Sequence, residues 1–118
     1  MIEKSNSYKL VETIVESADN MKAEDITILD LREIDNAVSQ YFIICSGNSN
    51  TQVSAIASNI EKQVRNNIQE RPIHSEGNQN AQWILLDYGN VVVHVFQKAI
   101  REYYDLESMW GDAKLISA

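Results

Sequence analysis

The strongest constraint on the fold is the stretch 83–96, in which two β-branched and aromatic runs meet at Gly89-Asn90. Such runs, joined by a Gly-Asn pair, predict a β-hairpin. A two-residue turn would set Tyr88 opposite Val91, whereas a four-residue loop would set Leu86 there. Both registers divide the side chains between the same two faces, because alternate residues of a strand point to opposite sides.

The two faces of this hairpin differ in chemistry. One is wholly apolar, and it comprises Ile84, Leu86, Tyr88, Val91, Val93 and Val95. The other mixes large apolar side chains with a carboxylate and an imidazole, and it comprises Trp83, Leu85, Asp87, Val92, His94 and Phe96. This mixed face is too polar for a plain core and too apolar for a plain surface, so it needs either a covering element or a partner.

The composition is that of a soluble globular protein, with 118 residues of which 44% are hydrophobic and 23% are charged. We therefore predict a single domain over residues 1–118, large enough to form a core without disulfides or metal ions. The sequence contains neither an apolar run of membrane-spanning length nor a signal-peptide pattern, which predicts a cytoplasmic protein. The single cysteine, Cys45, fits a reducing compartment as a small buried apolar residue.

The formal net charge is −7, from 17 acidic and 10 basic residues. Affinity for nucleic acid depends largely on Lys and Arg side chains that neutralise phosphates, so this balance argues against direct, sequence-specific nucleic-acid binding. An acidic protein suits a basic protein partner. The alternative is that the charge only keeps the protein soluble, and charge alone leaves both explanations open.

Hydrophobic spacing outlines the rest of the fold. The predicted elements are a helix over residues 5–21 capped by Ser5 or Ser7, strands at 26–31 and 41–45, a helix from the Ser49 cap to about Gln69, a short edge strand at 73–75, and a helix over 100–110 closed by Gly111. The strand at 41–45 is apolar on both sides, which is typical of a strand covered on both faces. This order of elements predicts an α+β fold with a mixed β-sheet and packed helices.

The motifs for catalysis are weak. Ser46-Gly47 precedes a helix, but without the lysine or the spaced glycines of a phosphate loop it is better explained as a capped turn. Carboxylates two residues apart fall in a loop or on a helix, where they do not point at the same ions. His94 shares its face with Asp87, but the two are several residues from being opposite, and no nucleophile is evident. We therefore predict no catalytic residue, no metal site and no cofactor.

The predicted last helix is better suited to binding. Helical spacing places Arg101, Tyr104, Asp105 and Ser108 on one face, opposite the expected packing residues Tyr103, Leu106 and Trp110. Arg101 and Asp105 either pair with each other at i, i+4 or form an interface hot spot with Tyr104. The mixed hairpin face favours the interface.

Several segments together resemble a known family. They are 22–26, Leu29-Asp30-Leu31-Arg32, Tyr41-Phe42-Ile43-Ile44-Cys45-Ser46-Gly47-Asn48-Ser49, Gln52-Val53, 55–57, Trp83, Leu86-Asp87-Tyr88-Gly89, 91–96, Arg101, 103–107 and Trp110-Gly111-Asp112-Ala113. In these residues the chain resembles the ribosomal silencing factor family (RsfS), also called Iojap-like proteins. The aspartate-tyrosine-glycine hairpin and the tryptophan-glycine-aspartate-alanine end are the most specific parts of the resemblance.

The resemblance implies a nucleotidyltransferase-like fold that lacks the catalytic carboxylates. It also implies a translational repressor that binds protein fourteen of the large ribosomal subunit, a basic protein on the intersubunit face, and so blocks joining of the small subunit under nutrient limitation. The alternative is a nucleotidyltransferase-like enzyme with residual nucleotide activity. Whether the free protein is a homodimer stays open.

Combined with the hairpin and helix patterns, the resemblance predicts a set of partner-binding residues. They are Trp83, Leu85, Asp87, Tyr88, His94, Arg101, Tyr104 and Asp105. The chain departs from the resemblance at Gln40, Thr51 and Asn90, where charged residues are usual, and at Met109, where leucine is usual. The first three remove charge at candidate contact positions, whereas the fourth conserves volume.

Overall fold

The structure is a computed structural model and describes residues 6–111 and 113–117. In chain order its elements are α1 (Asn6–Asn20), β1 (Glu24–Asp30), β2 (Tyr41–Gly47), α2 (Asn50–Ile68), β3 (His74–Glu76), β4 (Trp83–Asp87), β5 (Val91–Gln97), α3 (Lys98–Tyr104), α4 (Leu106–Met109) and β6 (Lys114–Ser117). The predicted cap Ser5 lies outside the described residues. Ser7 lies inside α1, where its hydroxyl accepts a hydrogen bond from Asn90 Nδ2.

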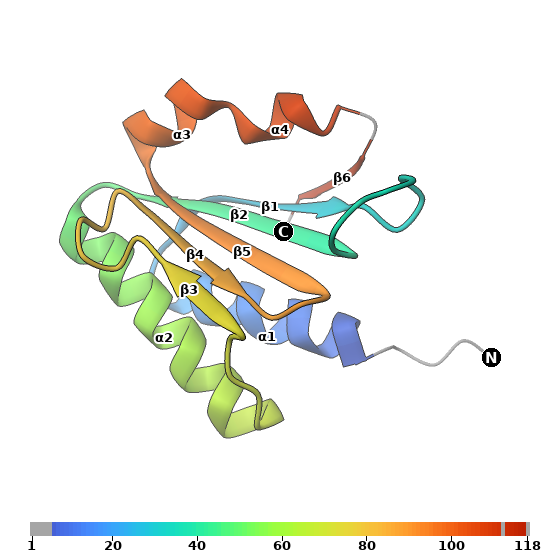
Figure 1. The fold of residues 1–118 in the computed structure, drawn as a ribbon. Helices are drawn as coiled ribbons and strands as arrows, with labels where there is room; N and C mark the ends of the chain where they lie inside the picture. The colour runs from blue at the N-terminus through green and yellow to red at the C-terminus, as the bar shows by residue number, and fades with distance from the viewer. Residues whose placement is uncertain (1–5, 112, 118) are drawn as a thin grey trace.

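Within the described residues, six strands form one sheet in the order β3-β4-β5-β2-β1-β6. The central pair, β2 and β5, is parallel, and the other neighbouring pairs are antiparallel. Figure 1 shows α1 and α2 on one side of this sheet and α3 and α4 on the other. We call these two sides the α1/α2 face and the α3/α4 face. Every residue of β2 is buried, which confirms the prediction of a strand covered on both sides.

The α1/α2 face holds the larger hydrophobic core. Two long helices, of 15 and 19 residues, pack the apolar stripe of each onto alternate residues of β2, β4 and β5. The longer helix, α2, begins as predicted at the Ser49 cap, whose Oγ accepts a hydrogen bond from Gln52 N at 3.1 Å. It ends at Gln69, which has a left-handed backbone and donates its N–H to Arg65 O.

The hairpin adopts the two-residue turn. Asp87 pairs with Val92, and Tyr88 N donates to Val91 O at 2.9 Å, so Gly89 and Asn90 alone form the turn. The two predicted faces are confirmed, because the apolar set lies in the core under α1 and α2 while Val92 and Phe96 pack in a second cluster under α3 and α4. The mixed face is thus partly covered from within the chain.

The C-terminal part differs from the prediction. The single helix expected over 100–110 is two short helices, because Asp105 adopts a left-handed conformation (φ 46°) that an α-helix cannot contain. The chain then adds β6 to the free edge of β1, a strand that the sequence patterns did not predict. The edge strand expected at 73–75 is present one residue later, at His74–Glu76.

The α+β fold with a mixed sheet and packed helices is confirmed. The likeness of this fold to that of nucleotidyltransferases, which the resemblance implies, stays a prediction.

Candidate functional site

A row of aromatic rings leads from the core of the α3/α4 face to the surface. Trp83 stacks on the fully buried Phe96, with ring centroids 4.7 Å apart, and the ring centroid of Tyr104 in α3 lies 5.0 Å from that of Trp83. Tyr103 continues the row at 5.1 Å from Tyr104. Exposure rises along this row, to 50% at Tyr104 and 81% at Tyr103. A row of this kind combines a rigid base with accessible aromatic area, which is the composition of many protein-binding hot spots.

For Tyr103 the side of the helix predicted from helical spacing is wrong. It was expected to pack inward, yet it is the most exposed of the large apolar side chains described. The break at Asp105 is the reason, because the helical phase that places Leu106 in the core does not continue back through α3. No pattern in the sequence marks Tyr103 as exposed without knowledge of that break.

The buried side chain of His94 forms a hydrogen bond with Trp83. Trp83 Nε1 donates to His94 Nδ1 at 3.1 Å, which requires a neutral imidazole with its hydrogen on Nε2. His94 is only 4% exposed, and this burial lowers its pKa from 6.5 to about 4. The imidazole therefore orients the indole ring and stays uncharged at neutral pH. Nε2 has no hydrogen-bond acceptor among the described residues.

Asp87 has a structural role at the hairpin turn. Its Oδ1 accepts the N–H of Gly89 at 2.7 Å, and its carbonyl oxygen accepts from Ile73 N, which holds the start of β3 to β4. Asp87 and His94 are not hydrogen-bonded to each other, since Asp87 Oδ1 accepts from the turn and His94 Nδ1 accepts from Trp83, so the geometry does not favour a proton-transfer dyad. The carboxylate remains half-buried at the surface, two residues along the strand from Leu85.

Arg101 lies where the sequence patterns did not place it. Its side chain was expected on an exposed helical face, but it is only 11% exposed and forms a salt bridge with Glu107 at 2.8 Å. The pairing of Arg101 with Asp105 that the sequence left open is not formed. Asp105 instead accepts the hydroxyl of Ser108 at 2.6 Å and remains exposed.

Tyr88 is separated from the other predicted contact residues. It is 5% exposed in the core of the α1/α2 face, and burial raises the pKa of its hydroxyl above the ordinary 10. A partner that docks on the α3/α4 face therefore has no direct access to Tyr88. The structure does bring the rings of Trp83, Tyr104 and Tyr103 into contact. With the other accessible residues that follow on the same side of β4 and at the end of α3, they form what we call the contact face, consisting of Trp83, Leu85, Asp87, Tyr103, Tyr104 and Asp105.

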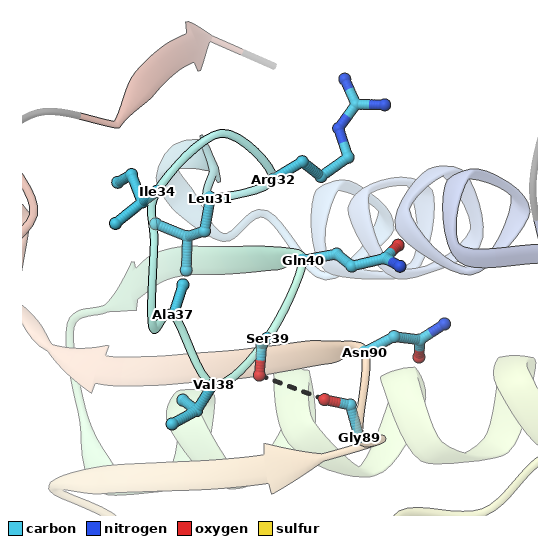
Figure 2. Close-up of a pocket in the computed structure, with 9 residues that line it drawn as sticks. All are labelled: Leu31, Arg32, Ile34, Ala37, Val38, Ser39, Gln40, Gly89 and Asn90. Atoms are coloured by element: carbon cyan, nitrogen blue, oxygen red, sulfur yellow. Dashed lines mark hydrogen bonds between the residues drawn. The ribbon is translucent and has the colours of Figure 1, made fainter.

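A hollow of about 560 Å³ lies at the end of the sheet where the hairpin turns. Figure 2 shows it between the loop that follows β1 and the turn at Gly89-Asn90, with Ser39 Oγ donating to Gly89 O at 3.1 Å. Gln40 and Asn90, two positions at which the chain departs from the resemblance, both line it. The lining contains Arg32 but neither a carboxylate nor a histidine, so the hollow lacks the groups of an acid–base site.

Other candidate chemistry is equally limited in the part of the chain that is described. No three His, Cys, Asp or Glu side chains gather there so as to hold a metal ion. Cys45 is fully buried, as predicted, and burial raises the pKa of its thiol to about 12, which makes it a poor nucleophile. In residues 6–111 and 113–117 no helix has the length and apolar character needed to cross a membrane.

Comparison with known proteins identifies relatives over nearly the whole chain. The family model described as "Ribosomal silencing factor during starvation" matches residues 4–118. Ribosomal silencing factor RsfS of Bacillus subtilis is 46% identical over 111 residues, covering 93% of this chain and 92% of that protein. A crystal structure from Chromobacterium violaceum has a TM-score of 0.82 at 34% identity, over 87% of this chain and 84% of that one. A second, from Bacillus halodurans, has a TM-score of 0.80 at 36% identity, over 93% and 98%.

The fold and the family match are those of a ribosome-associated regulator of translation. The chain belongs to the ribosomal silencing factor family, which confirms the resemblance drawn from its motifs.

Proposed function

We propose that this protein represses translation in the cytoplasm by binding protein fourteen of the large ribosomal subunit and blocking the small subunit from joining. The observation that carries this proposal is the contact face, on which Tyr104 lies against Trp83 and Tyr103 lies against Tyr104, with the carboxylates of Asp105 next to Tyr104 in the chain and of Asp87 further along β4. Family membership supports the ribosome as the target, and nutrient limitation as the condition.

Charge supports a basic protein as the direct partner. The chain carries a net charge of −7, and the contact face contains two carboxylates and no cation. Carboxylates beside aromatic rings suit Lys and Arg side chains, which form ion pairs and lie over ring faces. Phosphates would be repelled by the same surface, so we propose that the protein docks on a ribosomal protein and not on ribosomal RNA.

Repression by this protein is proposed to be steric and to need neither nucleotide nor catalysis. A domain of 13.4 kDa on the joining face occupies space that the small subunit needs. Because the net charges of the protein and a basic partner are opposite, association should slow as salt rises, while the buried aromatic contacts chiefly set the lifetime of the complex.

The test is sucrose-gradient sedimentation with purified subunits and an ordered addition. Protein added to free large subunits before small subunits should co-sediment with them and suppress joining in proportion to occupancy, without GTP or ATP. Protein added to preformed ribosomes should act only as fast as they dissociate spontaneously. A strict nucleotide requirement, or rapid splitting of preformed ribosomes, would contradict the steric mechanism.

A further inference from the structure

One side chain joins the C-terminal helices to the sheet through several hydrogen bonds. Arg101 Nη1 donates to the backbone oxygen of Asp25 at 2.7 Å and to Ser46 Oγ at 3.0 Å. Its Nη2 donates to Thr27 Oγ1 at 3.1 Å and to Glu107 Oε2 at 2.8 Å, and Nε donates to the same Glu107 oxygen at 3.2 Å. A nearly buried guanidinium with this many acceptors is held in one orientation.

The acceptors on the sheet depend on an irregularity in β1. The pairing of β1 with β2 shifts register between Glu24 and Thr27, and Asp25 within this bulge has a left-handed φ of 50°. A bulge leaves one residue out of the ladder, so its carbonyl oxygen is free to accept from elsewhere. Here Asp25 O accepts from both Thr27 Oγ1 and Arg101. The sheet thus presents a carbonyl and two hydroxyls where Arg101 reaches it.

The position of α3 depends on this contact because its apolar contacts are few. No residue of α3 is buried, and its apolar contacts with the sheet side are the partly buried Ile100 and the Tyr104 ring beside Trp83. Its last turn, however, contains Arg101, and Asp105 N donates to Arg101 O at the junction with α4. Through Glu107 the same guanidinium also binds α4. Arg101 therefore ties α3, α4 and the sheet together next to Tyr104.

We propose that Arg101 is a positioning residue for the partner: with Glu107 it holds the α3–α4 junction on the sheet, so that Tyr104 lies against Trp83 before binding. This inference rests on the proposed function and changes the role of Arg101 from a direct contact to a support. A surface ordered in advance binds with less loss of conformational entropy than one that orders on contact. A lysine cannot replace this arginine, because one ammonium group cannot reach all of these acceptors in the same planar geometry.

The test compares Arg101→Gln with Arg71→Gln, which removes the same charge from an exposed loop. Hydrogen exchange of the free proteins reports on the helices without any ribosome, and co-sedimentation with large subunits reports on binding. In Arg101→Gln we expect backbone amides of residues 98–109 to exchange about 10-fold faster or more, while β2 is unchanged, and binding to weaken about 10-fold. Arg71→Gln should match the wild type in both measurements.

Two further variants keep the test decisive if Arg101→Gln does not fold. Thr27→Val and Ser46→Ala each remove one hydroxyl acceptor of Arg101 on the sheet, with little change in side-chain shape. Each should speed exchange in α3 and weaken binding by about 2- to 3-fold, and neither should add to the effect of Arg101→Gln in a double variant, because they act through the same side chain. Arg101→Lys should fall between wild type and Arg101→Gln.

The outcomes separate the possible roles of Arg101. Unchanged exchange with lost binding in Arg101→Gln would make it a direct contact and overturn the proposal. Faster exchange with wild-type binding would overturn it as well, leaving a purely structural role. If wild-type protein itself does not bind large subunits, the proposed function fails, whereas the exchange result still decides whether Arg101 holds the helices.

Discussion

The two faces of the sheet are stabilised in different ways. On the α1/α2 face, two long helices cover an almost continuous apolar layer, in which Ile14, Ile43, Ile60 and Val93 are completely buried. On the α3/α4 face, helices of 7 and 4 residues cover a smaller cluster that includes stacked rings. The first face gains stability from buried area, and the second depends more on specific bonds.

This difference explains why recognition is expected on only one face. Apolar burial is non-directional and tolerates many arrangements, so it stabilises the fold without setting the position of any one surface group. The Trp83–His94 hydrogen bond and the Arg101 contacts are directional. They place particular rings at particular points of the surface, which a partner can then recognise.

The largest expected effect comes from putting a charge into the apolar core. Val93→Asp buries an unpaired carboxylate under α1 and α2, which should cost on the order of 4 kcal/mol and unfold the domain. Val38→Asp is the matched control, since Val38 is 80% exposed and should tolerate the change. Circular dichroism and size-exclusion chromatography distinguish the two. A folded, soluble Val93→Asp protein would show that the assignment of the two faces is reversed.

The next effect concerns binding and not stability. Tyr104→Ala removes the half-exposed ring beside Trp83 and should weaken binding to large subunits by on the order of 2 kcal/mol, with little change in the melting temperature. Tyr8→Ala on α1 is the control, because Tyr8 is similarly exposed, at 40%, but lies on the helix of the other face. Equal binding by both variants would show that the partner does not bind the α3/α4 face. Unfolding of Tyr104→Ala would show that the ring is part of the core.

A smaller effect should appear when pH is lowered. The folded protein holds the pKa of His94 near 4, below the 6.5 of an unfolded histidine, because the ring is buried. The unfolded chain therefore takes up the proton first, so stability is complete above pH 6.5 and is lost as pH falls toward 4. By pH 5.5 the loss should be about 1.4 kcal/mol relative to pH 7.5.

Urea denaturation at these two pH values measures that loss. In His94→Gln the difference between the two pH values should shrink, whatever its stability at pH 7.5. In the control His74→Gln it should persist, because the buried His94 is unchanged. An undiminished pH dependence in His94→Gln would mean that another group on this face takes up the proton.

The difference between the two faces of the sheet also explains which parts of the structure could be predicted from the sequence. The α1/α2 face could be predicted from hydrophobic periodicity. The alternate apolar residues in 83–96 and the apolar stripes of the two long helices indicate which side chains are buried. The break at Asp105 follows from no local pattern, because aspartate adopts a left-handed backbone only where its surroundings favour it. Arg101 was misplaced for the same reason: its acceptors include a carbonyl in a bulge 76 residues away along the chain.

The smallest expected effect compares two left-handed positions, one associated with each face. Gln69 (φ 59°) ends α2, and Asp105 (φ 46°) joins α3 to α4. Glycine adopts this conformation without the steric cost of a side chain, which stabilises the folded protein. Its greater freedom in the unfolded chain offsets part of this gain, so Gln69→Gly should give a net stabilisation of roughly 0.5 kcal/mol. Asp105→Gly gains the same relief but loses the hydrogen bond to Ser108, so its net effect should be near zero. Urea denaturation resolves the difference, and equal stabilisation by both substitutions would show that this directional bond contributes nothing to holding the α3–α4 junction.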